Sequence, residues 1–261
     1  MNPRHWRRAL FLLAMSSTLG QQAHGQSVPG QALRAVYIGS NPAHAVRDAA
    51  TGTVRGAVVD ITNEFARRRS VTATLTGAAS AQAVIDAVRN GQADIGFVAR
   101  NPERAGPVQF SQPYMLVQQT FIVSEGSGIK AIADIDRPNR KLGATRADSI
   151  ALYLARTLKQ GQLVELDAPA PDDLRQMLLS GKLDAFGANR QRLSDMLRSL
   201  SGVRLLPDDL YGVEQTIIVA NDRADLLAAV NRFIEDIRAS GFLRTAIERS
   251  GVVGLSVAPA P

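Results

Sequence analysis

The same succession of helix, glycine and strand occurs twice in this chain, and it narrows the possible folds more than any other feature. The two copies, Gly91-Gln92-Ala93-Asp94 and Gly181-Lys182-Leu183-Asp184, begin 90 residues apart. Each follows an apolar helical segment and precedes a short strand. Glycine is the usual residue just after a helix because it adopts left-handed backbone angles without strain. Two such units predict an α/β fold of two lobes, each rich in βαβ segments.

The spacing of apolar residues predicts the elements of each unit. In the first unit we expect strands at 33–38, 71–75 and 94–98, a helix around Val58, Ile61 and Phe65, and a helix capped by Ser80 and closed by Gly91. In the second unit we expect strands at 141–145, 163–166 and 184–187, a helix capped by Ser149, and a helix at 171–179.

Two long β-rich segments, 116–124 and 213–220, are predicted to cross between the lobes. The first lobe would then consist of residues 27–117 and 217–261, with the second lobe, 118–216, inserted between them. Residues 226–237 and 242–249 have helical periodicity and complete the first lobe. The tail, 252–261, is rich in Val, Ala and Pro, and we expect it to be loose.

The first 26 residues have the layout of a secretory signal peptide. Three arginines at positions 4, 7 and 8 precede an apolar segment at 9–15, and Ala23-His24-Gly25 forms a small-x-small cleavage site. The apolar segment is shorter than the ~20 residues that a membrane-spanning helix needs. The sequence therefore predicts a protein secreted to the periplasm.

Composition excludes several classes of function. Without the three arginines of the leader, the net charge falls from +6 to +3, which is too mild to indicate a nucleic-acid partner. The chain has no cysteine, so disulfide and thiolate chemistry are excluded. His44 is the only histidine after the leader, so a multi-histidine metal site is excluded, and we predict no cofactor. We expect His44 to be a solvated loop residue.

The segment from Gly91 to Tyr114 holds the most specific motif. A strand ends in an Asn-Pro-Glu-Arg turn at Arg104, and Phe-Ser-Gln-Pro-Tyr follows at 110–114. Backbone N–H groups at the end of a strand and a planar guanidinium can converge on one carboxylate. The segment resembles the signature of the bacterial extracellular solute-binding proteins of family 3. The resemblance implies a two-lobe periplasmic binding protein fold (type II), an α/β fold whose two lobes are joined by two crossing strands.

The resemblance also implies the site residues of the first lobe. Arg104 would bind a ligand carboxylate, together with N–H groups near Phe97 and Ala99. Asn41, in the loop after the first strand, would help to wall the pocket, although an ordinary turn is an equal alternative.

In the second lobe the resemblance points to Asp148, Ser149 and Asn189. Asp148 and Ser149 begin a helix whose N-terminus can hold an anion, or they are simply its cap. Asn189 stands where amino-acid binders of this family carry an Asp that pairs with the ligand's α-ammonium. A neutral amide cannot offset the desolvation of a buried ammonium, so either the ligand lacks the amine or Asp148 supplies the charge.

The leading functional hypothesis is a monomeric solute-binding protein of an ABC-type importer. It would bind a small carboxylate-bearing solute, an amino acid or an organic acid, between its lobes by hinge closure, and deliver it to a permease in the inner membrane. It would not be an enzyme. One alternative is a dehydratase-type enzyme on the same scaffold, with Asp148 or Glu214 as its acid. The other is a ligand-sensing module that docks on a membrane partner.

Overall fold

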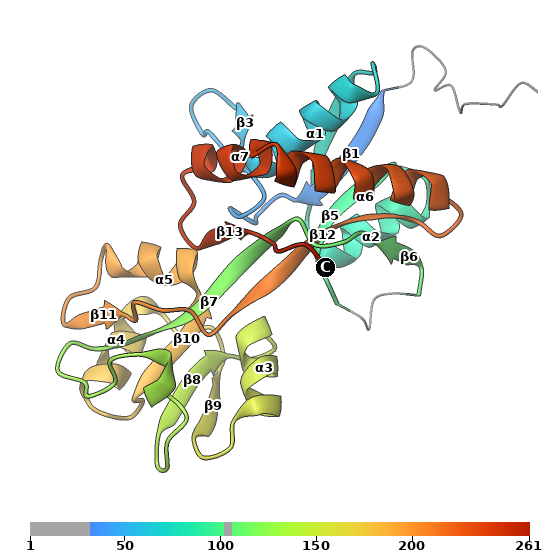
Figure 1. Ribbon diagram of the computed structural model, residues 1–261. Helices are drawn as coiled ribbons and strands as arrows, with labels where there is room; N and C mark the ends of the chain where they lie inside the picture. The colour runs from blue at the N-terminus through green and yellow to red at the C-terminus, as the bar shows by residue number, and fades with distance from the viewer. Residues whose placement is uncertain (1–31, 102–105) are drawn as a thin grey trace, which may run out of the picture.

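A computed structural model of the chain describes residues 32–101 and 106–261 (Figure 1). The predicted signal peptide and Arg104 lie outside the described residues. The described part forms two α/β lobes connected by long strands, as the fold prediction requires.

The first lobe is a mixed sheet with helices on both faces. Its strands β1 (Leu33–Ile38), β4 (Ala73–Ala78) and β5 (Ile95–Ala99) are parallel, and the later half of β12 (Tyr211–Ala220) pairs antiparallel with β5 and with β6 (Val108–Phe110). One face packs against α1 (Ala57–Arg68), α6 (Ala224–Ala239) and α7 (Phe242–Ser250), and the other against α2 (Ala81–Arg89). A small hairpin, β2 (Val46–Arg47) with β3 (Val54–Arg55), precedes α1.

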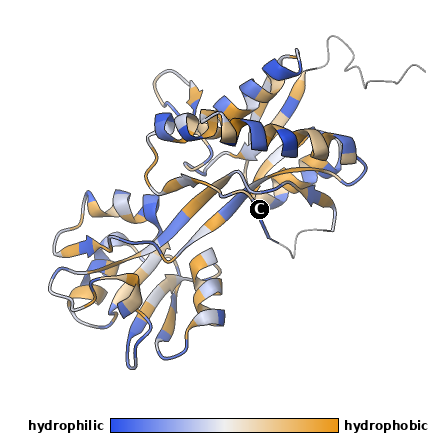
Figure 2. Ribbon diagram, viewed as in Figure 1, coloured by the Kyte–Doolittle hydropathy of each residue, from blue (hydrophilic) through white to orange (hydrophobic). Residues whose placement is uncertain are grey.

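Side-chain alternation along the strands explains the two faces. Ala35 and Tyr37 join the core under α1 and α6, whereas Val36 joins the core under α2. All three side chains are buried, so residues 35–38 of this strand form a continuous apolar run in the sequence. The helices carry their apolar residues on one side and polar residues on the other (Figure 2).

The second lobe repeats this plan. Its parallel strands are β8 (Lys141–Thr145), β9 (Gln162–Leu166) and β10 (Ala185–Asn189), and β7 (Met115–Ser124) pairs antiparallel with β10 and with β11 (Val203–Leu205). Its helices are α3 (Ser149–Thr157), α4 (Pro171–Leu179), α5 (Arg190–Leu197) and the short 3-10 helix η2 (Ile132–Asp134). Its two core clusters lie on opposite faces of the sheet, one with α3 and one with α4 and α5.

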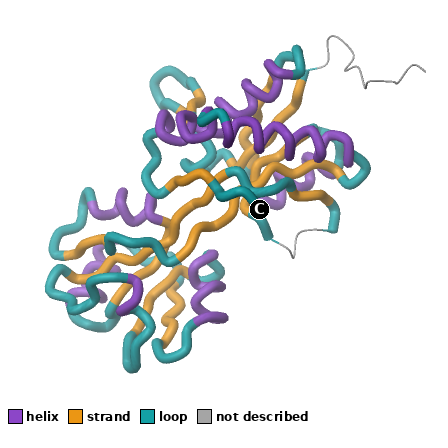
Figure 3. Tube along the Cα trace, viewed as in Figure 1, coloured by secondary structure: helices purple, strands orange, loops and turns teal. Residues whose placement is uncertain are grey.

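Strands β7 and β12 run from one lobe into the other (Figure 3). Residues 115–119 of β7 pair with residues 211–215 of β12, and beyond this shared stretch each strand pairs only with its own lobe. The boundaries expected from the sequence, at 117/118 and 216/217, fall inside these two strands. Because the strands continue through the junction, the lobes share one hydrogen-bonded sheet.

The prediction that residues 252–261 are loose is wrong. They include β13 (Leu255–Val257), which pairs antiparallel with β7, and Ala258, which is fully buried and donates its N–H to Tyr114 O at 3.1 Å. The tail also reaches the second lobe, where Val253 N–H donates to Gln191 Oε1 at 3.0 Å. A three-residue strand has too little alternation to be recognised, so the sequence alone did not show this pairing.

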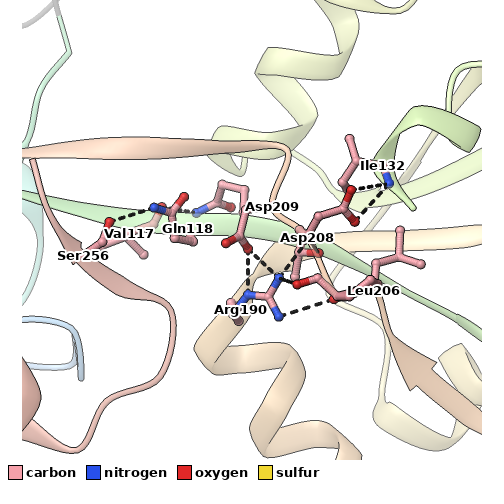
Figure 4. A network of polar contacts seen from close by, with 11 residues as sticks. Val117, Gln118, Ile132, Arg190, Leu206, Asp208, Asp209 and Ser256 are labelled. Atoms are coloured by element: carbon pink, nitrogen blue, oxygen red, sulfur yellow. Dashed lines mark hydrogen bonds and ion pairs between the residues drawn. The ribbon is translucent and has the colours of Figure 1, made fainter. Parts of the chain in front are cut away.

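A polar network lies beside this contact (Figure 4). Gln118 on β7 donates from Nε2 to Ser256 Oγ at 2.8 Å, and its N–H donates to Gly254 O at 2.8 Å. In the second lobe, Arg190 donates to Asp209 Oδ1 at 2.6 Å and to Asp208 O at 2.8 Å. The tail therefore forms a further link beside the two crossing strands.

Two details of the helices differ from the sequence predictions. Asp148, not Ser149, occupies the N-cap position of α3. Helix α5 was not predicted, because it has only eight residues, its apolar stripe is limited to Leu193, Met196 and Leu197, and Leu193 is its only fully buried residue. Within the described ranges, no helix combines the length and apolarity needed to span a membrane.

Candidate functional site

A pocket of about 220 Å³ lies between the lobes, beside the crossing strands. The carboxyl ends of β1, β5 and β10 meet there. Ligands of α/β proteins commonly bind at this edge of the sheet. We call it the first pocket, and it is lined by Ile38, Asn41, Ala99, Val117, Gln119, Asp148, Ser149, Ile150, Ala188, Asn189, Arg192, Val213 and Gln215.

On the side of the first lobe, Asn41 and Ala99 line the first pocket. Asn41 shapes its own turn, because its Oδ1 accepts the N–H of Ala43 at 3.0 Å. Ala99 ends β5, opposite Gln215 of β12. Phe97 is fully buried two residues earlier, with its ring edge-on to Tyr114, and it does not line the pocket.

The Phe-Ser-Gln-Pro-Tyr segment anchors the chain where it passes into β7. Ser111 N–H donates to Ile217 O at 2.9 Å, and Ser111 Oγ accepts the N–H of Ile217 at 2.9 Å. Tyr114 N–H donates to Gln215 O at 2.9 Å, and its ring is fully buried. Burial raises the pKa of the Tyr114 phenol, so it stays protonated. The motif thus fixes the crossing strands rather than contacting the first pocket.

A buried polar pair supports the base of the first pocket. Gln215 lines the pocket, donates from Nε2 to Val213 O at 3.2 Å and places Oε1 3.0 Å from His44 Nε2. Since the amide oxygen accepts, His44 donates from Nε2, and its Nδ1 is left as a buried acceptor without a hydrogen-bond partner. Burial lowers the pKa of His44 to about 4.

The expectation that His44 is solvated is therefore wrong, because its side chain is completely buried. Ala43 and Ala45 on either side of it are buried as well, so the loop after β1 folds inward. His44 N–H donates to Asn41 O at 3.0 Å, and Val58 N–H of α1 donates to His44 O at 3.2 Å. The turn that carries Asn41 to the pocket is the same turn that buries His44.

On the side of the second lobe, the N-terminus of α3 lines the first pocket with Asp148, Ser149 and Ile150. The first N–H groups of a helix have no partner within it and carry its positive dipole end, which favours an anion. The helix lies close to β10 because position 187 is glycine: a Cβ there would lie 2.5 Å from Ile150 Cδ1. The turn before the helix holds Ala147 at φ 62°, a left-handed conformation that favours glycine.

An ion pair faces the first pocket beside this helix end. Arg192 Nη1 lies 3.2 Å from Asp148 Oδ2 and 3.5 Å from Thr145 Oγ1. The side chains of Arg192 and Asp148 remain 36% and 43% exposed, so both can reach a solute. Asn189 also lines the pocket, but its Oδ1 already accepts the N–H of Arg192 at 2.8 Å as the cap of α5.

Sequence reasoning did not identify Arg192. The available signal was Asn189 itself, because Asn is a preferred helix cap and the third residue after a cap lies back toward it. A cap at the end of β10 would have placed Arg192 at the edge where the pocket forms. The apolar stripe that follows this cap, Leu193, Met196 and Leu197, spans only five residues, so the helix was not recognised.

A second pocket of about 490 Å³ adjoins the first and shares Ala99, Ser149 and Val213 with it. Arg100 lies here, with its Nη1 3.3 Å from Glu214 Oε2. Tyr153 and Tyr211 stack with ring centroids 4.1 Å apart. Burial raises the pKa of the Tyr211 phenol. The remaining lining residues are Asn101, Ala147, Leu152, Arg156 and Gly212.

The structure thus brings five of the residues expected from the sequence to one pocket, namely Asn41, Ala99, Asp148, Ser149 and Asn189. Phe97 lies in the core, and Arg104 lies outside the described residues. No cluster of three or more potential metal ligands occurs among the residues that the structure describes.

Solved structures with this fold are numerous. AbpA, an amino acid ABC transporter substrate-binding protein from Streptococcus pneumoniae bound to L-arginine, matches with a TM-score of 0.58 and 20% identity over 84% of this chain and 93% of its own. The sensor domain of a histidine kinase matches with a TM-score of 0.62 and 19% identity over 87% of this chain and 98% of its own. An ancestral amino acid-binding protein, a precursor of cyclohexadienyl dehydratase, matches with a TM-score of 0.59 and 19% identity over 84% of this chain and 94% of its own.

At these identities the structural matches show the fold and leave the ligand open. A comparison with curated protein sequences gave no match. The sequence profile of the bacterial extracellular solute-binding proteins, family 3, matches residues 33–250, which is most of the chain and spans both lobes. The chain therefore belongs to the bacterial extracellular solute-binding proteins of family 3.

Proposed function

We propose that this protein binds a small carboxylate-bearing solute, an amino acid or an organic acid, between its two lobes as the periplasmic component of an ABC-type importer. The observation that carries the proposal is the first pocket, which is bounded by both lobes and lined by the N-terminus of α3 and by Arg192. A solute held there contacts both lobes at once, so its binding energy favours the closed arrangement.

The carboxylate is held by charge and by backbone N–H groups. The N-terminus of α3 offers unpaired N–H donors, and Arg192 adds a guanidinium whose planar fork matches a carboxylate. Arg104 is proposed, from the sequence motif, to grip the same group from the side of the first lobe, beyond Ala99. Asn41 and Ser149 complete the polar wall of the pocket.

The charges of the first pocket favour an acid without a free amine. Asp148 is the one carboxylate among its described lining residues, and Arg192 already neutralises it. Asn189 cannot offer a charge to an ammonium, and its amide oxygen is engaged as a helix cap. An α-amino acid would have to compete with Arg192 for Asp148, whereas an organic acid brings no ammonium that needs a carboxylate partner.

Delivery and location follow from the same proposal. The predicted signal peptide directs the chain to the periplasm, where a single copy would close on its solute about β7 and β12. A permease of the inner membrane would then recognise the closed form.

Catalysis is a weaker proposal than binding. An acid catalyst must present a proton to the substrate, but Asp148 is paired with Arg192 and Glu214 with Arg100. The likeness to a dehydratase precursor is one of fold. The same holds for the histidine kinase sensor domain, so a sensing role has no support from a specific residue here.

The proposal is tested with residues 27–261 and a panel of amino acids and organic acids. A ligand raises the melting temperature with the logarithm of its excess over its dissociation constant, so a thermal-shift screen identifies the acids to be titrated by calorimetry. Arg192→Gln is expected to weaken binding of the best acid by roughly tenfold or more, because it removes a charge-assisted contact. Arg104→Ala is expected to have a still larger effect. Arg198→Gln, at the C-cap that follows the same helix and with a side chain 80% exposed, is the matched control and should leave the affinity unchanged.

Asp148→Asn separates the two classes of solute. For an organic acid, removing this negative charge should leave the affinity unchanged or raise it. For an α-amino acid held through Asp148, the same change should weaken binding strongly. If no acid of the panel binds, or if both arginine variants bind like the wild type, the proposed site is wrong.

A further inference from the structure

The second pocket belongs to the same cleft as the first, yet the proposed contacts of a small acid leave it unused. The two share Ala99, Ser149 and Val213, so they adjoin, and a solute held in the first pocket lies next to the second. The second pocket is the larger, at about 490 Å³ against about 220 Å³. Space of this size indicates a solute longer than a single carboxylate group and its immediate substituents.

One stripe of α3 forms a wall of the second pocket. Ser149, Leu152, Tyr153 and Arg156 line it, and they are spaced at i, i+3, i+4 and i+7 along the helix. Ser149 also lines the first pocket. Because a helix rises 1.5 Å per residue, the stripe leads about 10 Å from the first pocket to Arg156.

Arg156, at the far end of the stripe, carries a positive charge that no carboxylate of the described residues pairs with. Arg100 is paired with Glu214 at 3.3 Å, but the exposed side chain of Arg156 makes no ion pair or hydrogen bond to another residue of the described ranges. The described charged groups that line the second pocket are thus two guanidinium groups and one carboxylate. A second anionic group of a solute would find its counter-ion in Arg156.

The middle of the stripe is apolar and aromatic. The Leu152 side chain is 51% exposed, which is unusual for a leucine in this protein. Beside it, the rings of Tyr153 and Tyr211 stack at an interplanar angle of 12°, which joins α3 to the crossing strand β12. A hydrocarbon segment lying over Leu152 and the tyrosine pair would bury this surface.

We propose that the solute is an elongated dianion, with one carboxylate in the first pocket and a second anionic group bound by Arg156 in the second. The inference rests on the proposed function, because the first pocket must hold a carboxylate for the second group to reach Arg156. An α,ω-dicarboxylate with a hydrocarbon chain between its acids has the required chemistry. A cationic amino acid places a positive group beside Arg156 and is disfavoured.

The test compares acids that differ only in the second charge. Calorimetric titration of residues 27–261 uses two matched pairs, hexanoate with adipate and octanoate with suberate, at fixed ionic strength. The dianion of at least one pair is expected to bind about tenfold more tightly than its monoanion. Arg156→Gln is expected to abolish this difference while the affinity for the monoanion stays unchanged. Arg244→Gln, an exposed arginine on α7, is the control for net charge and should retain the difference.

The outcomes separate this inference from the proposed function. If the monoanions bind in an Arg192-dependent manner but the dianions bind no more tightly than their monoanions, the first pocket is confirmed and the proposed binding of a second anionic group by Arg156 is refuted. The same conclusion follows if Arg156→Gln keeps the preference for dianions. If free arginine binds more tightly than every acid of the panel, or if no acid binds, the inference is overturned.

Discussion

His44 shows how a single buried residue ties the binding loop to the crossing strands. Its ring donates to Gln215 on β12, while its backbone accepts from Val58 on α1 and donates to Asn41 at the first pocket. The ring is fully buried with Nδ1 unpaired, so protonation would place a charge in the core with no acceptor for the new proton. The neutral ring is the form compatible with the native fold.

The pH dependence of stability follows from this burial. The folded pKa of His44 is about 4, and the unfolded value is 6.5, so the unfolded chain takes up a proton first as the pH falls. The contribution that the neutral His44 makes to the free energy of unfolding is therefore present above pH 6.5 and is lost as the pH falls toward 4. Between pH 7.5 and pH 5 the loss should be about 2 kcal/mol. Urea unfolding of residues 27–261 at several pH values measures it.

His44→Gln is the control, because glutamine retains a hydrogen-bonding group but does not titrate. This variant should be less stable at pH 7.5, yet its stability should change little between pH 7.5 and 5. No other histidine follows the leader, so this window is free of other histidine titrations. Equal slopes for the wild type and the variant would show that His44 is not the buried neutral group described here.

Elements differ in how far the sequence determines them. The strand at 141–145 and the helix at 171–179 are predicted with the bounds that the structure has, since alternation, Pro171 and the acidic first turn all agree. Ser80 is predicted as a cap, and its Oγ accepts the N–H of Ala83. Strands β6, β11 and β13 have three residues each, too few for periodicity, and they are held by partners far away in sequence.

The candidate site, too, is predictable from the sequence only in part. Asn41, Ala99, Asp148 and Asn189 each follow or end a recognisable strand, so their convergence at one sheet edge can be inferred from the topology. The Arg192–Asp148 ion pair and the Tyr153–Tyr211 stack depend on how α3 packs against α5 and β12 within the second lobe, which no local pattern encodes. The family motif supplied Arg104, which periodicity alone would have left as a surface arginine.

The tail is the element with the clearest test. Deletion of residues 252–261 removes β13, the buried Ala258 and hydrogen bonds to Gln118, Tyr114 and Gln191. We expect a loss of about 2–4 kcal/mol from these contacts. That loss corresponds to a fall in melting temperature of roughly 5–15 °C for a chain of this size. Deletion of only 259–261, whose residues are all exposed, should leave the melting temperature unchanged. A ten-residue deletion without effect would mean that the tail does not pack as described.

At the level of the whole molecule, the two lobes are connected by strands rather than by a flexible linker. Residues 115–119 and 211–215 form a continuous ladder, and β13 adds a strand to it on the side of the first lobe. A change in the angle between the lobes must therefore arise from twist and bending in these strands. Both pockets lie against this ladder, since Val213 lines each of them.

The most direct test of the central claim is the distance between the lobes with and without a bound acid. The chain has no cysteine, so Gln82→Cys on α2 and Ala155→Cys on α3 would label one exposed position in each lobe for energy-transfer measurements. We predict that a saturating acid from the panel shortens this distance, and that Arg192→Gln requires more acid for the same change. A pair at Ala155 and Arg198, both in the second lobe, should not respond. A bound acid that leaves the distance between the lobes unaltered would contradict binding in a cleft that closes.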